Sequence, residues 1–300
     1  MLDISVIILT YNEEIHIQRC LDNIVDIVKT VYIIDSFSTD RTLDIAKQYE
    51  HVVILQNKWI NYATQFNWAL NHAPIDTKWV LRLDADEYLT QDLKLELSEK
   101  LPFLSKEYTG IIFPLRRVFL GKVIRKGMPQ VKLLRLFQYG KAISEVRLMD
   151  EHIQLVEGKC VEFEHEFADD NLNNLSWWSQ KHIGYAIREA VDLLDIELDL
   201  TGVAETDKNK QISAQALRKR MKKHQYARQP LFWRSFAYFC YRYFLKLGFI
   251  EGKEGFLWHF LQGWWYRTLV DAKVFEIKQA CGTDKEKIKR YLKEHYNISL

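Results

Sequence analysis

Residues 79–87 read WVLRLDADE, an apolar run that ends in two carboxylates separated by one residue. The run predicts a strand buried on both faces, and Asp84 and Asp86 follow directly at its carboxyl end. Two acids at i and i+2 in a turn can face one ligand, so that one reaches a ribose or a water while the other binds a hard divalent cation. Such a cation usually completes its shell with diphosphate oxygens. The simpler alternative is that one of the two acids caps the helix that follows Thr90.

Strand and helix signals alternate through the residues around this run. Predicted strands cover 4–9, 31–34, 52–55 and 79–83, and predicted helices cover about 12–28, 40–49 and 62–70. The alternation is typical of βαβ units, so we predict an α/β fold with a mixed, mainly parallel sheet flanked by helices. Ligands of such sheets bind beyond the carboxyl ends of the strands. The polar segments 10–13, 35–40 and 84–87 all fall there.

Composition excludes several classes of protein. The chain has 300 residues, of which 48% are hydrophobic and 27% charged, as in an ordinary globular protein. The formal net charge of +2 gives no strong field for a polyanion, so we expect no nucleic-acid partner. The first of the 12 glycines is Gly110, which excludes a glycine-rich nucleotide loop in the N-terminal third. The four cysteines form no C-x-x-C pair, which favours a reducing compartment over a metal knuckle or a disulfide framework.

The composition changes toward the C-terminus, where aromatic and basic residues gather. We expect one domain over 1–205 and a basic, aromatic-rich helical region over 206–300. On a helical projection, Arg234, Arg242 and Lys246 share a sector of about 120°, and aromatic residues fill much of the rest. This pattern, with the basic run RKRMKK before it, predicts helices lying in the interface of a bilayer. The alternative is that the aromatic residues form an internal helical core or a dimer interface.

The segments ISVIILTYNEE (4–14), IIDSFSTD (33–40) and WVLRLDADE (79–87) resemble inverting glycosyltransferases of family 2, which have the GT-A fold. The resemblance implies that Asp86 binds Mg²⁺ or Mn²⁺, that Asp84 faces the ribose and that Asp35 binds the base. It also implies a set of residues around a nucleotide-sugar donor: Thr10, Asn12, Glu13, Ser38, Gln65 and Asn67. The sequence has Phe37 where relatives often have glycine, which narrows the loop around Ser38.

Inversion at an anomeric carbon needs a carboxylate that takes the proton of the acceptor hydroxyl. Asp150 and Glu151 are the candidates, with Asp150 favoured; the alternative is that they are exposed loop charges. His165 follows a predicted strand and is a candidate for contact with the metal or the diphosphate, or a structural histidine. Arg125 and Arg135 are candidates for holding the diphosphate or an acidic acceptor, or members of a solvated basic loop.

The segments FEHEF (163–167), KHIGYAIREAVDLLD (181–195) and QGWWYRTLVDA (262–272) resemble the lipopolysaccharide-core glucosyltransferase group within family 2. This second resemblance implies a UDP-hexose donor and a glycolipid or other lipid-linked saccharide as acceptor. We therefore expect a cytoplasmic protein peripheral to the inner face of the cell membrane. Two alternatives stay open: a polyprenyl-phosphate glycosyltransferase, and a non-catalytic membrane scaffold of the same fold. A homo-oligomer is also compatible with the sequence.

Overall fold

The computed structural model describes residues 1–145, 152–202 and 225–300. The chain divides into two compact units. The first contains residues 1–125 and 129–173, and the second contains residues 126–128 and 174–300. Residues 146–151, which include the candidate bases Asp150 and Glu151, lie outside the described part of the chain.

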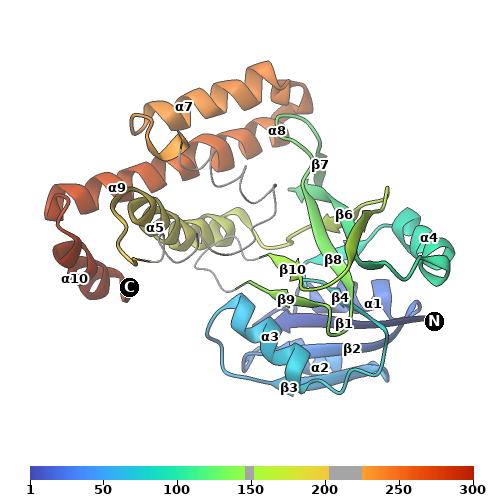
Figure 1. The fold of residues 1–300 in the computed structure, drawn as a ribbon. Coiled ribbons are helices and arrows are strands. Elements are labelled where there is room, and N and C mark those ends of the chain that lie inside the picture. The colour runs from blue at the N-terminus through green and yellow to red at the C-terminus, as the bar shows by residue number, and fades with distance from the viewer. Residues whose placement is uncertain (146–151, 203–224) are drawn as a thin grey trace. The chain divides into compact units, whose positions relative to one another are not determined.

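The first unit is built on a sheet that has ten strands among the described residues, in the order β3-β2-β1-β4-β8-β6-β12-β5, with β7 and β11 paired to β6 (Figure 1). The strands of its N-terminal half are β1 (Leu2–Thr10), β2 (Val28–Asp35), β3 (Val52–Gln56), β4 (Trp79–Arg82) and β5 (Glu87–Leu89). The later strands are β6 (Tyr108–Phe119), β7 (Lys122–Ile124), β8 (Lys132–Gln138), β11 (Lys159–Glu162) and β12 (Phe167–Asp169). β1 to β4 are mutually parallel, whereas β8 runs antiparallel to both β4 and β6. A separate hairpin pairs β9 (Ala142–Ser144) with β10 (Ile153–Leu155).

Helices cover both faces of this sheet, which confirms the predicted α/β class. One face packs against α1 (Ile17–Ile24), α2 (Thr42–Ala46) and α4 (Gln91–Lys100). The other face packs against α3 (Tyr62–His72) through Phe66, Ala69 and Leu70 (Figure 1). A short 3-10 turn, η1 (Leu101–Phe103), follows α4. Both cores are apolar and buried, as the continuous apolar runs of β1 and β2 require.

The first helix is shorter than we predicted. The sequence pattern extended it to about residue 28, but α1 ends at Ile24 and Val28 already pairs with Leu2 as the start of β2. Val28 is fully buried at the start of β2. An apolar residue fits the end of a helix as well as the start of a strand, so the pattern did not distinguish the two.

The second unit is helical. Its helices are α5 (Leu175–Leu198), α7 (Trp233–Cys240), α8 (Gly252–Trp258), α9 (Tyr266–Cys281) and α10 (Lys285–Tyr296). The π-helical stretch η3 (Tyr241–Leu245) continues α7, and a second one, η5 (His259–Trp265), joins α8 to α9. The elements α7 and η3 form one arm, and α8, η5 and α9 form the other. A 3-10 turn, η4 (Gly248–Glu251), connects the two arms. Figure 1 shows the two arms side by side as a helical hairpin. Within the residues that the structure describes, none of the helices combines the length and the apolar composition that a bilayer span requires.

The long helix α5 belongs to the second unit, whereas we expected it at the end of the first domain. Its apolar face, with Ala186, Ala190 and Leu194, packs against Val270 and Val274 of α9. Because the C-terminal helices cover this face, the compact units divide after Asn173 rather than near residue 205.

Glu96 fastens α4 to the segment that follows β11. Its buried carboxylate accepts hydrogen bonds from the backbone N–H groups of Glu164 and His165 and from Lys100. Burial alone would raise the pKa of Glu96, but these donors lower it to about 2. The ionised carboxylate of Glu96 therefore stabilises the folded state at neutral pH.

We predict that Glu96→Gln lowers the free energy of unfolding by about 2 kcal/mol at neutral pH, because the amide binds these donors less strongly. A depressed pKa contributes stability above the ordinary value of 4.5 and loses it as the pH falls toward 2. The deficit of the variant should therefore shrink between about pH 5 and about pH 2. Urea titrations over this range test the prediction, with the exposed Glu99→Gln on the same helix as control. A deficit that stays constant with pH would contradict it.

Candidate active site

The carboxyl ends of β1, β2 and β3 bring three polar side chains side by side. In the parallel register, Thr10 pairs with Asp35, and Asp35 pairs with Gln56. The fully buried carboxylate of Asp35 accepts hydrogen bonds from Thr10 Oγ1 at 3.1 Å and from Gln56 Nε2 at 3.1 Å. It also accepts from the backbone N–H and the hydroxyl of Ser38. These four bonds fill the acceptor capacity of a carboxylate, so a nucleobase would have to replace one of them.

The loops that follow β1 and β2 interlock around this carboxylate. The backbone N–H of Asn12 donates to Ser38 Oγ at 2.9 Å, and the Asn12 side chain accepts from the N–H of Thr39 at 2.8 Å. The N–H of Glu13 donates to Thr42 Oγ1. The structure thus gathers five residues predicted to surround the donor: Thr10, Asn12, Glu13, Asp35 and Ser38. Their contact with a donor stays a prediction.

Phe37 lies at the tip of the second loop in a strained conformation. Its φ is +63°, in the left-handed region that a bulky side chain rarely adopts, and its ring is 55% exposed. A glycine at this position would adopt the same φ without strain. The exposed ring points out of the loop's own core rather than filling it.

Asp84 and Asp86 lie just beyond β4, in the turn that leads into β5. The N–H of Asp84 donates to Glu87 Oε2, and its carbonyl accepts from the N–H of Glu87, so the turn is closed on itself. The Asp84 carboxylate lies 3.6 Å from Arg82 Nε and 3.6 Å from an Arg135 nitrogen. The acids therefore belong to a turn of their own, and Thr90 supplies the cap of the following helix, α4.

Acidic groups outnumber cations around this turn. Glu87 is buried and forms an ion pair with Arg135, and Asp169 of β12 lies opposite Glu87 in the sheet. Burial raises the pKa of Glu87 well above its usual range, and the carboxylates of Asp84 and Asp86 raise it further against the effect of Arg135. Burial and the charge of Asp86 raise the pKa of Asp169 to about 6. A divalent cation would relieve this excess of negative charge.

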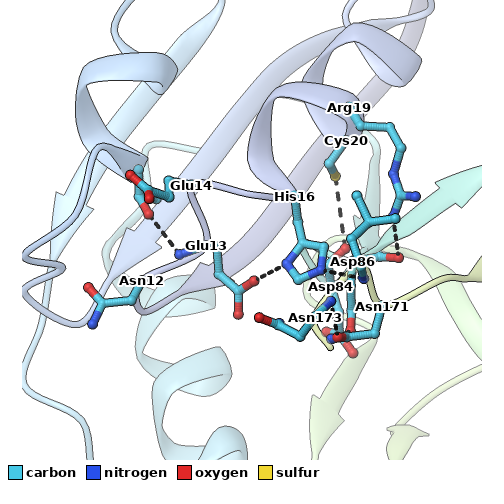
Figure 2. A network of polar contacts seen from close by, with 12 residues as sticks. Asn12, Glu13, Glu14, His16, Arg19, Cys20, Asp84, Asp86, Asn171 and Asn173 are labelled. Atoms are coloured by element: carbon cyan, nitrogen blue, oxygen red, sulfur yellow. Dashed lines mark hydrogen bonds and ion pairs between the residues drawn. The ribbon is translucent and has the colours of Figure 1, made fainter. Parts of the chain in front are cut away.

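A strap of residues 169–173 holds the turn in place (Figure 2). Asn171 Nδ2 donates to Asp86 Oδ2 at 2.9 Å, which fixes the orientation of that carboxylate. Arg19 of α1 forms an ion pair with Asp170 at 2.7 Å and also donates to the carbonyl of Asp86. We predicted no role for the strap, because Asn171 lies 85 positions from Asp86 in the sequence. The acid and amide run DDNLNN was the one available signal.

His16 connects the strap to the loop after β1. The buried ring bonds to Glu13 Oε2 through Nδ1 at 2.6 Å, and Nε2 accepts the N–H of Leu172 at 2.9 Å. Because Nε2 accepts a backbone N–H, this network places the proton on Nδ1. Figure 2 shows the imidazole between Glu13 and the group formed by Asp84, Asp86 and Asn171. His16 thus links the loop after β1 to the strap, and Asn171 of the strap contacts Asp86.

Several other predicted residues are engaged inside the protein. Gln65 is fully buried and joins Ser36 to Asn57. Asn67 exchanges two hydrogen bonds of 2.8 Å with the backbone of Ser144, in β9. This bond anchors the β9–β10 hairpin, whose strands flank the segment that contains Asp150 and Glu151. Contact of Gln65 and Asn67 with a donor stays a prediction.

The basic candidates and His165 also have protein partners. Arg135 is buried against Glu87, so the predicted solvated loop does not apply to it. Arg125 is exposed and forms an ion pair with Glu166 at 3.1 Å. The imidazole of His165 bonds to Glu96 at 2.9 Å through Nδ1. Metal or diphosphate contact by these three residues stays a prediction.

Among the described residues, no three His, Cys, Asp or Glu side chains gather as a metal-binding group. The available donors are the hard carboxylate oxygens of Asp84 and Asp86, beside the raised pKa values of Glu87 and Asp169. Two carboxylates fit Mg²⁺ or Mn²⁺ that draws its other ligands from water and a diphosphate. They do not fit a metal that needs a complete protein shell.

Residues 5–152 match the sequence profile of Glycosyl transferase family 2. Residues 5–152, just under half of the chain, are a glycosyl transferase family 2 domain. The matched region contains every strand-end residue described above and the D-x-D turn, and it ends one residue after Glu151. The family 2 domain and the mixed, mainly parallel α/β sheet agree with the GT-A fold that the resemblance implied.

Similar proteins match only part of the chain. An uncharacterized glycosyltransferase of Rickettsia typhi is 39% identical over 97 residues, which are 32% of each chain. The glycosyltransferase SunS of Bacillus subtilis is 32% identical over 134 residues, which are 39% of this chain and 31% of SunS. The chain thus spans about a third of the length of the curated relatives it matches.

Two solved structures illustrate the structural likeness. S. aureus TarS 1–349, solved with UDP-GlcNAc, aligns with a TM-score of 0.41 and 15% identity over 99% of this chain and 92% of TarS 1–349. Glucosyl-3-phosphoglycerate synthase from Mycobacterium tuberculosis, solved with Mn²⁺ and UDP, aligns with a TM-score of 0.29 and 20% identity over 39% of this chain and 44% of the synthase.

We predict that Arg135→Met lowers the free energy of unfolding by about 3 kcal/mol, because it leaves the Glu87 carboxylate buried without its cation. Combining it with Glu87→Gln should recover part of that loss in a double-mutant cycle measured by urea unfolding. Arg116→Met is the matched control: Arg116 pairs with Glu166 at 2.9 Å but is more exposed, so its loss should cost about 1 kcal/mol or less. Additive single and double effects would show that Arg135 and Glu87 are not coupled.

Proposed function

We propose that the chain is an inverting, metal-dependent glycosyltransferase that moves a hexose from a UDP-sugar to a hydroxyl of a lipid-linked saccharide. The observation that carries the proposal is that the family 2 domain coincides with the sheet edge where Asp35 and the D-x-D turn lie. Similar proteins are in line with it, because they include the glycosyltransferases of Rickettsia typhi and Bacillus subtilis.

In this proposal the donor nucleotide lies over the loops that Asp35 organises. Thr10, Asn12 and Ser38 belong to backbone segments held by mutual hydrogen bonds, so the donor meets a preformed surface. Asp84 and Asp86 would hold Mg²⁺ or Mn²⁺, which offsets the charge that develops on the departing diphosphate. Asn171 keeps the Asp86 carboxylate in one orientation whether or not the donor is bound.

The transfer exchanges one bond for another at the anomeric carbon. The bond to the diphosphate oxygen breaks, and UDP leaves with its electron pair. The acceptor oxygen forms the new bond from the opposite face while its proton moves to a carboxylate. We assign this carboxylate to Asp150, with Glu151 as the alternative; both lie in the sequence between β9 and β10.

The acceptor and the place of the reaction extend the same proposal. The likeness of the second half to lipopolysaccharide-core glucosyltransferases supports a glycolipid acceptor at the inner face of the cell membrane. A polyprenyl-phosphate acceptor is the second candidate, since a phosphate is already ionised and needs no base.

We expect Asp86→Asn to reduce turnover of the preferred UDP-hexose by about a hundredfold or more, because a charge-stabilising ligand is lost. The same variant should bind Mn²⁺ more weakly in an electron paramagnetic resonance titration. Asp44→Asn is the control, because Asp44 lies exposed on α2. Equal turnover and equal Mn²⁺ affinity in the wild type and in Asp86→Asn would overturn the metal assignment.

Asp150→Asn and Glu151→Gln distinguish the two acceptor classes. With a hydroxyl acceptor, the variant that lacks the base should lose about a hundredfold or more in kcat while its affinity for the UDP-sugar is unchanged. With a phosphate acceptor, both variants should retain their kcat. Single-turnover transfer and calorimetric titration of the donor measure the two quantities separately.

A further inference from the structure

The hairpin of the second unit reverses the usual placement of charged and apolar side chains. Helices lying in a bilayer interface would have Arg234 and Arg242 at the headgroups, whereas the structure buries both side chains. Arg234 is 3% exposed and bonds to the buried carboxylate of Asp271 at 2.8 Å. Arg242 is 1% exposed and donates to the side-chain oxygen of Gln262 on the opposite arm. Both guanidinium groups thus lie inside the hairpin, where Arg234 is paired with a carboxylate and Arg242 with a side-chain amide.

The turn of the same hairpin exposes apolar side chains instead. We call this surface the apolar tip; it consists of Phe244, Leu245, Leu247, Phe249 and Ile250. Their exposed fractions run from 47% to 74%. Large apolar side chains exposed this densely within seven residues are unusual on a surface that faces water, and they mark a contact with lipid or protein.

The charges around the apolar tip point to one of these partners. Lys246 and Lys253 are exposed, whereas Glu251 is buried and accepts the backbone N–H of Lys126. Glu254 is half-buried, so the fully exposed charges beside the tip are the two lysines, which complement anionic headgroups. A twofold pairing of two tips would instead bring two copies of Lys246 together.

We propose that the apolar tip inserts into the headgroup and upper acyl region of a bilayer that contains anionic lipids. The apolar side chains leave water, the two lysines contact lipid phosphates, and the arginines stay paired inside the hairpin. A turn of this size anchors without spanning the bilayer. The inference concerns the second unit alone and does not depend on the proposed transfer reaction.

The test is flotation of the full chain with vesicles of phosphatidylcholine and phosphatidylglycerol, and with phosphatidylcholine alone. The wild type should float with the anionic vesicles and less with the neutral ones. The double variant Leu245→Glu/Phe249→Glu should lower the apparent partition constant by about tenfold or more. Phe103→Glu is the matched control, because Phe103 is 87% exposed in the first unit, and it should float like the wild type.

Thermal unfolding of all variants verifies that the exposed substitutions leave the fold intact. Flotation of the double variant at the wild-type level would overturn the proposal, as would a wild type that floats with neither vesicle. Sedimentation velocity without lipid identifies the competing partner: a wild-type dimer that does not float, and that the double variant loses, would assign the tip to a second copy. Because no sugar donor is present, failure here leaves the Asp86 experiment unaffected.

Discussion

The parallel pairing of β1 with β2 and β4 is the constraint on which the site depends. It brings the ends of strands that are far apart in sequence to one edge of the sheet. A buried carboxylate at this edge must be fully hydrogen-bonded, and Asp35 is, through Thr10, Ser38 and Gln56. The same carboxylate therefore organises the loops that a donor would meet. Loss of these bonds would loosen the edge as a whole rather than one contact.

The turn after β4 holds several carboxylates close to one another. Four carboxylates lie close together, and Arg82, Arg117 and Arg135 offset part of their charge. The strap orients Asp86 through Asn171, while His16 links the strap back to the loop after β1. Keeping like charges together at a cost in stability is more typical of functional sites than of structural ones.

The two units use arginine in a similar way. Arg135 in the sheet and Arg234 in the hairpin are both buried against carboxylates. In the first unit the ion pair positions residues of the proposed site. In the second unit it removes charge from the surface of the hairpin and leaves the apolar tip to define that surface.

The local pattern of the sequence was sufficient for the α/β class, the four parallel strands and the acidic strand ends. Continuous apolar runs followed by polar residues are typical of buried parallel strands whose carboxyl ends face a ligand site. The spacing of the two acids singled out the D-x-D pair, and the resemblance to family 2 singled out Thr10, Asn12 and Glu13.

The tertiary structure alone decided which side chains meet across long separations. Asn171 and Arg19 reach Asp86 from distant segments, and no periodicity in the sequence reports such a contact. The direction of Arg234 and Arg242 was likewise invisible, because a helical projection shows which residues share a face but not whether that face meets a partner carboxylate. Gln65 and Arg135 followed the same rule: burial and partners, which only the folded chain supplies, determined what their polar groups do.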